Sequence, residues 1–103
     1  MKSIHRYEVE IADSTYPLMP QGAEILNIGV KMMYQRDGHP RADIWAKVDT
    51  EAPLVPRHIR IYGTGHPLEE GVEETYIGTI QVAMGALIFH AFDRGEVAPQ
   101  SNA

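Results

Sequence analysis

The fold is indicated most clearly by Arg57-His58-Ile59-Arg60-Ile61-Tyr62, which continues into Gly63-Thr64-Gly65-His66-Pro67. In the first half, isoleucines alternate with polar or aromatic side chains, and a period of two residues is typical of a half-buried β-strand. The second half ends the strand, because glycine allows the positive φ of a tight turn and proline cannot donate to a ladder. The stretch therefore predicts a strand followed by a sharp loop.

The same alternation on either side of this stretch predicts five further strands. They are expected over Ile4 to Ala12, Ala23 to Met32, Asp43 to Asp49, Thr75 to Val82 and Leu87 to Phe92. In the second of them, Leu26 and Ile28 are expected on one face of the strand. A helix is the alternative there, since Ile25, Ile28 and Met32 also fit a period of 3.6, but Gly29 and the β-branched residues favour a strand.

Turn signals separate these strands. Asp13 to Thr15 predicts a turn, Pro17 to Pro20 an extended connector or sheet edge, Arg36 to Pro40 a hairpin turn, and Ala83 to Ala86 a reversal. We expect one all-β domain over residues 1–95, with about six short antiparallel strands and little or no helix. A small barrel and a two-sheet sandwich both fit this pattern. Residues 96–103 lack periodic apolar side chains and predict a flexible tail.

Composition restricts the partners. The chain has 103 residues, with nine Lys and Arg against fourteen Asp and Glu and a net charge of -5. Nucleic-acid binding is disfavoured, because it needs a clustered basic surface. The absence of cysteine excludes disulfides and thiolate metal sites. No apolar run could span a bilayer and no secretion signal follows Met1, so we expect no membrane partner and a cytoplasmic location.

Three short motifs carry a resemblance to a known family. They are Gly63-Thr64-Gly65-His66-Pro67, Tyr76-Ile77-Gly78-Thr79 and Phe89-His90-Ala91-Phe92. With these motifs the chain resembles, over residues 5–93, a family of small uncharacterised proteins of bacteria and phages, a domain of unknown function. The resemblance implies a phage-related origin and assigns neither an activity nor a catalytic residue.

Histidines provide the candidate ligand-binding residues. The glycines beside His66 let backbone and ligand approach closely, and Thr64 adds a hydroxyl group. His58 and His90 lie on predicted strands that could bring them to the same loop. No pair of histidines has the i, i+4 or His-x-His spacing of a metal site, so we expect no metal and no cofactor.

Aromatic residues provide the candidate interface. Trp45, Tyr62 and Tyr76 fall on strand faces opposite the expected core, and exposed aromatic residues are enriched at protein interfaces. A second core layer is the alternative for them. The glutamates of the following loop, Glu69, Glu70, Glu73 and Glu74, are expected to be a solvated acidic segment.

Two functions fit these observations. The first is a non-enzymatic β module that acts through self-association or by docking a protein partner, because no catalytic constellation is visible and Leu87 to Phe92 is apolar on both faces. The second is a small-ligand or metal-binding protein, enzymatic or not, that uses the loop from Gly63 to Pro67. An enzyme is the less favoured of the two classes.

Overall fold

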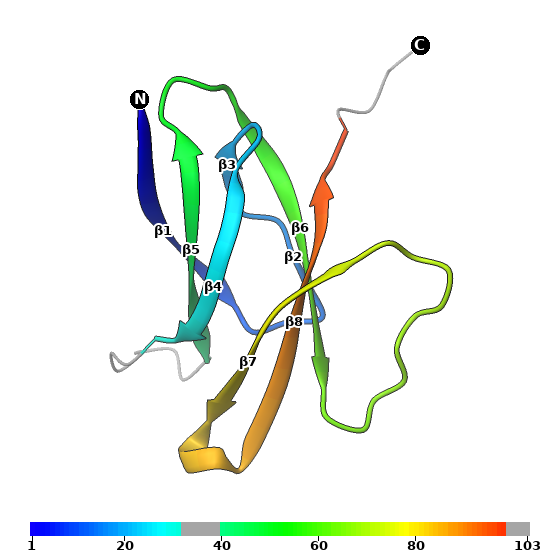
Figure 1. Ribbon diagram of the computed structural model, residues 1–103. Helices are drawn as coiled ribbons and strands as arrows, with labels where there is room; N and C mark the ends of the chain where they lie inside the picture. The colour runs from blue at the N-terminus through cyan, green and yellow to red at the C-terminus, as the bar shows by residue number, and fades with distance from the viewer. Residues whose placement is uncertain (32–39, 99–103) are drawn as a thin grey trace.

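A computed structural model describes residues 1–31 and 40–98, in which two antiparallel sheets pack face to face (Figure 1). The all-β prediction is confirmed, and two separate sheets make the architecture a sandwich. The elements in chain order are β1 (Lys2–Glu10), β2 (Ser14–Thr15), β3 (Leu18–Pro20), β4 (Glu24–Val30), β5 (Arg41–Asp49), β6 (Leu54–Gly63), β7 (Thr75–Val82), the 3-10 turn η1 (Ala83–Gly85) and β8 (Leu87–Glu96).

The first sheet has the strand order β1-β5-β4, and the second has the order β2-β6-β8-β7 with β3 also paired to β6. The expected hairpin is confirmed by the antiparallel pairing of β4 with β5. Its predicted turn, Arg36 to Pro40, lies outside the described residues except for Pro40. Among the strands that the structure describes, only β4-β5 and β7-β8 are pairs of consecutive strands, and the other four pairings join strands that are further apart in the chain.

One connection differs from the sequence prediction. Ser14–Thr15, expected as a turn, forms a short strand opposite Arg60 and Ile59. Leu18–Pro20 pairs with the start of β6, which agrees with the predicted sheet-edge alternative. Both segments are short, and β-strands this short leave little periodicity in a sequence.

The predicted face of Leu26 is wrong, because β4 contains a bulge between Ile25 and Asn27. A bulge inserts one extra residue and reverses the alternation beyond it. Ile25 and Ile28 therefore both face the core, whereas Leu26 is 45% exposed.

Two residues of the expected tail, Glu96 and Val97, are held by hydrogen bonds to the body of the domain. Glu96 is the last residue of β8, its carboxylate accepts a hydrogen bond from Gly22 N at 2.9 Å, and Val97 N donates to Pro56 O at 2.9 Å. Residues 99–103 lie outside the described residues.

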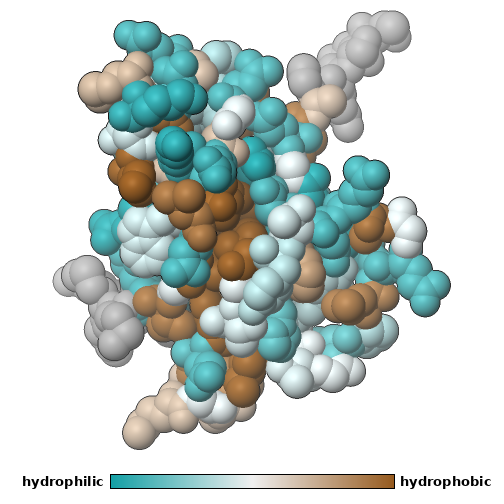
Figure 2. Space-filling model, viewed as in Figure 1, coloured by the Kyte–Doolittle hydropathy of each residue, from teal (hydrophilic) through white to brown (hydrophobic). Residues whose placement is uncertain are grey.

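The core lies between the two sheets. Ile28, Ile44 and Val48 face it from the first sheet, and Ile59 and Ile61 from the second. Figure 2 shows a column of hydrophobic side chains where the sheets meet, flanked by hydrophilic surface. Burial of this apolar surface is the main favourable term for the fold.

One mostly buried ion pair lies in β6 and β8. The guanidinium of Arg57 donates to both carboxylate oxygens of Asp93, at 2.9 and 2.7 Å, and also to Ala23 O at 2.8 Å. The two side chains are only 13% and 15% exposed. Burial raises the pKa of Asp93, but hydrogen bonds from Arg57 and from the Gly95 N–H outweigh it and hold the pKa below its ordinary value.

The loop after β6 depends on two glycines for different reasons. Gly65 has a φ of +86°, a conformation that a β-carbon resists. At Gly63, a β-carbon would lie 2.9 Å from Cε1 of His66, because the imidazole ring packs directly on the backbone there. His66 N donates to Gly63 O at 3.1 Å and closes the turn.

We predict that Asp93→Asn lowers the free energy of unfolding by about 3 kcal/mol at pH 7, since it leaves a buried guanidinium without its counter-charge. A carboxylate with a lowered pKa stabilises the fold above its unfolded pKa of about 3.9, and that stability is lost as the pH falls further. Urea unfolding at pH 7, 5 and 3.5 should show a smaller loss of stability on acidification for the variant than for the wild type. Glu70→Gln, at an exposed carboxylate, is the control. Equal losses of unfolding free energy for the two variants would contradict a stabilising role for the Arg57–Asp93 ion pair.

A double-mutant cycle tests the loop. Gly63→Ala should cost less than about 1 kcal/mol, because the exposed His66 ring can turn away from the new methyl group, and this cost should disappear in a His66→Ala background, where the ring is gone. Gly65→Ala should lower the unfolding free energy by about 1 kcal/mol in both backgrounds, because the loss comes from the positive φ of the backbone and not from the His66 ring. Thermal unfolding of the six chains measures these terms, and additivity of Gly63→Ala with His66→Ala would show that the ring contact is unimportant.

Candidate functional site

The candidate site lies on the outer face of the second sheet, where three strands place aromatic rings in a row. Phe92 of β8 is opposite Tyr76 of β7 in the sheet register, and Tyr62 comes from β6. The ring centroids of Tyr62 and Tyr76 each lie 5.6 Å from that of Phe92 with edge-on geometry. Such contacts are favourable beyond the area that they bury, so the three rings form a fixed row.

Beside the aromatic row lies a row of hydroxyl groups centred on His90. Nε2 of His90 is 2.7 Å from Thr64 Oγ1, and Nδ1 is 3.0 Å from Thr79 Oγ1. Thr79 Oγ1 also forms a hydrogen bond with the hydroxyl of Tyr76. Both ring nitrogens of His90 therefore have partners, which fix the ring and place the hydroxyl groups of Thr64 and Tyr76 at the two ends of the row. The Thr64 hydroxyl also donates to Ile88 O at 3.4 Å.

On the other side of the aromatic row, two arginines anchor the loop between β6 and β7. Arg94 donates to Glu74 Oε1 and to the Tyr62 hydroxyl, both at 2.9 Å, and lies 3.3 Å from Glu69. Arg60 lies 3.4 Å from Glu69 and 4.3 Å from the ring centroid of Tyr62. The hydrogen bond from Arg94 lowers the pKa of Glu69. These contacts hold the loop over Tyr62.

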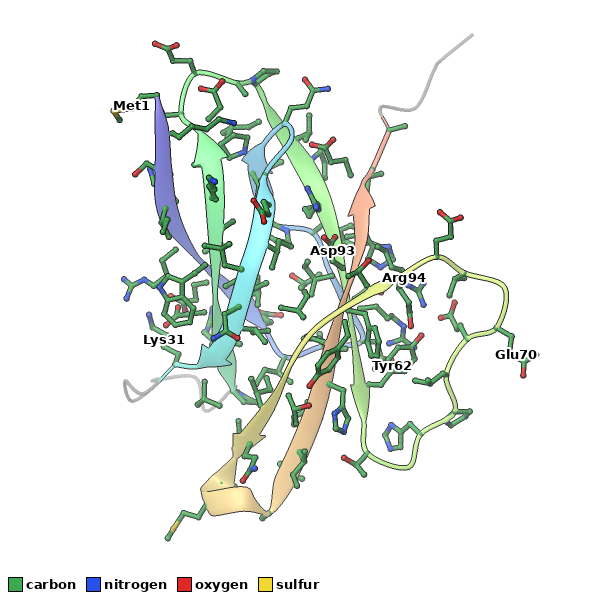
Figure 3. All side chains as sticks on the ribbon, viewed as in Figure 1. Met1, Lys31, Tyr62, Glu70, Asp93 and Arg94 are labelled. Carbon is green, nitrogen blue, oxygen red and sulfur yellow. The ribbon has the colours of Figure 1, made fainter. Side chains whose placement is uncertain are left out.

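Figure 3 shows Tyr62 and Arg94 near one another on the inner side of this loop, with Glu70 pointing away from the body. Glu74 is only 11% exposed, and Glu69 is 50% exposed. The expectation of a solvated acidic segment is therefore wrong for Glu74, which is mostly buried against Arg94, whereas Glu69 is exposed although it pairs with Arg94 and Arg60. Glu70 and Glu73 are exposed.

Between the loop and the sheet is an open pocket of about 420 Å³. Its lining residues are Tyr62, Gly63, Thr64, Gly65, His66, Leu68, Tyr76, Thr79, His90 and Phe92. A second cavity of about 280 Å³ shares Gly63, Thr64 and His66 with it and is otherwise lined by residues 86–89. The pocket thus combines aromatic walls with a few hydroxyl and imidazole groups, as ligand sites commonly do.

The structure brings together most of the residues that the sequence analysis selected. Thr64, His66 and His90, chosen as ligand-binding candidates, line the pocket beside Tyr62 and Tyr76, chosen as interface candidates. Tyr62 is buried beneath the loop, and Tyr76 is 55% exposed.

Two selected residues lie outside this pocket. His58 Nε2 is 2.9 Å from Ser14 Oγ, and its ring stacks on Tyr16 with 4.6 Å between centroids. Burial and the nearby Arg94 and Arg60 lower the pKa of His58. Trp45 is on the outer face of the first sheet, where its ring covers Gly29. Within residues 1–31 and 40–98, no group of three His, Asp or Glu side chains could hold a metal ion.

Thr79 and Phe92 line the pocket but were not predicted as site residues, although both lie in the Tyr76-Ile77-Gly78-Thr79 and Phe89-His90-Ala91-Phe92 motifs. Phe92 alternates with His90 along β8, so period two would have placed the two on one face. Thr79 carried no such signal, because a bulge in β7 between Tyr76 and Gly78 changes its face.

Comparison with known proteins identifies the family. No helix in the described part of the chain is long and apolar enough to cross a membrane. No curated protein and no solved structure matches the chain. A family model described as a domain of unknown function, DUF7352, matches residues 1–102, and the chain therefore belongs to that family.

Proposed function

We propose that the protein binds a small aromatic or heteroaromatic ligand in the pocket between the β6–β7 loop and the second sheet. The observation that carries the proposal is the placement of the aromatic row directly beside the row of hydroxyl groups on His90. A flat apolar ring is matched by the rings of Tyr76 and Phe92, while Tyr62, which is buried, packs against Phe92 and holds it in place. A polar substituent on that ring is matched by the hydroxyl groups.

The volume and charge of the pocket support the same class of ligand. About 420 Å³ is within the range of small-molecule sites, which span roughly 300 to 1,000 Å³. The nearest charged side chains, Arg60, Arg94, Glu69 and Glu74, are paired with one another and not with the pocket. A ligand with little net charge is therefore favoured over a highly charged one.

The hydroxyl row can serve either hydrogen-bonding polarity. A neutral imidazole donates through one nitrogen and accepts through the other, and the tautomer decides which. Switching the tautomer of His90 would reverse the direction of the hydrogen bonds to Thr64 and Thr79, so the Tyr76 hydroxyl at the end of the row can donate to a carbonyl or accept from an amide. This favours a carboxamide-like substituent on the ligand.

We also propose a cytoplasmic location and a phage-related origin for the protein. The origin is supported by the motifs of the 63–67 loop and of β7 and β8. Fractionation of the native host would test the location.

We predict that benzamide binds more tightly than cyclohexanecarboxamide, a probe of similar size without a π-system. Ring contacts worth about 1 kcal/mol correspond to roughly a fivefold difference in Kd. Titration followed by amide chemical shifts should move signals of Thr64, Thr79 and Phe92 in a saturable way.

Matched histidine variants complete the experiment. His90→Ala should weaken benzamide binding at least fivefold, because it removes the group that holds both hydroxyls, whereas His58→Ala, outside the pocket, should leave Kd unchanged. Thermal unfolding confirms that both variants fold. Shifts confined to another surface, or equal losses for the two variants, would refute the proposal.

A further inference from the structure

Strand β1 has a free edge. Thr50 N donates to Met1 O at 2.9 Å and Ile11 N donates to Pro40 O at 3.2 Å, so the odd-numbered residues of β1 form the hydrogen-bonded pairs with β5. The N–H and C=O groups of Ile4, Arg6 and Glu8 consequently point the other way. In the described part of the chain, β5 is the only strand that pairs with β1. Figure 1 shows β1 at the outer side of the first sheet.

This edge lacks most of the features that usually prevent edge-to-edge pairing. Such features are bulges, prolines, short length, inward-pointing charges and charged side chains along the edge, and β1 has only the last of them, at Lys2, Arg6, Glu8 and Glu10. β1 has nine residues in unbroken register with β5 and contains neither Pro nor Gly. Its inward-facing side chains, Ser3, His5, Tyr7 and Val9, include no carboxylate, lysine or arginine. The edge is therefore long, regular and open to another strand.

The charges on the outer face are complementary to those of a second copy. Glu8 is 38% exposed and contacts Lys31 at 3.1 Å and Arg41 at 3.5 Å, whereas Arg6 is exposed and makes no ion pair with any described residue. In an antiparallel pair with Tyr7 opposite Tyr7, each Arg6 lies opposite Glu8 of the second copy. A shift of two residues would instead place Arg6 opposite Arg6.

We infer that two copies of this chain associate through antiparallel pairing of their β1 strands, with Arg6 of each facing Glu8 of the other. The even-numbered residues then exchange the backbone hydrogen bonds that are unused in one copy, and the two three-stranded sheets become one continuous sheet. Opposite charges directly across a strand pair are favourable, and like charges are unfavourable. This register is therefore the one that the side chains favour.

The test is sedimentation equilibrium of the full chain at protein concentrations from about 1 µM to about 1 mM. A dimer with a Kd within this range changes from mostly monomer to mostly dimer across it. The wild type should show a monomer–dimer equilibrium. Arg6→Glu should raise Kd at least tenfold, because it places a glutamate opposite Glu8 in both halves of the interface. Lys47→Glu makes the same change of charge on the central strand of that sheet and should leave Kd unchanged.

A mixing experiment tests the register. Arg6→Glu and Glu8→Arg should each be mainly monomeric alone and should dimerise when mixed, because both cross-strand positions then carry opposite charges. If Glu8→Arg fails to fold, as far-ultraviolet circular dichroism would show, the comparison of Arg6→Glu with Lys47→Glu still decides. A wild type that is monomeric throughout, or an Arg6→Glu variant that dimerises like Lys47→Glu, would overturn the inference.

Discussion

The bulge in β7 is the constraint on which the site depends. In a regular strand, Tyr76 and Thr79 would point to opposite faces, because they are three residues apart. The extra residue between Tyr76 and Gly78 puts both on the outer face, where Tyr76 meets Phe92 and Thr79 meets His90. It also turns Gly78 and Ile80 inward, where Gly78 has room for Ile28. One irregularity thus completes both the outer rows and the inner packing.

Strands were the predictable part of this fold, and bulges were not. Ile59 and Ile61 are buried as their alternation predicts, since a period of two follows directly from strand geometry. Leu26 is the extra residue of the bulge in β4 and Thr79 lies beyond the bulge in β7, and a single inserted residue changes the alternation without any change in composition. Sequence periodicity therefore locates a strand well but relates the faces of two residues correctly only when no bulge lies between them.

The part of the candidate site that lies in the 63–67 loop could be predicted from its local motif. The ion pairs between residues far apart in the sequence could not. The glycines of the 63–67 loop indicated a special backbone, and the structure gives Gly65 a positive φ while Gly63 accommodates the ring of His66. The pairing of Glu69 and Glu74 with Arg94 joins residues 20 or more positions apart. Nothing in the spacing of those charges reveals it, because the loop must first fold over the sheet. The same holds for Tyr62, whose alternation suggests exposure and whose burial is due to that loop.

The two surfaces with proposed roles are physically separate, and this separation has a consequence. Figure 1 shows β1 at one side of the sandwich and the β6–β7 loop at the other. Pairing through β1 extends the first sheet, and the pocket belongs to the outer face of the second. Neither surface needs residues of the other, so association would leave the pocket open to solvent. The sandwich therefore allows a dimer with two independent ligand sites, and any coupling between them would have to pass through the packed core.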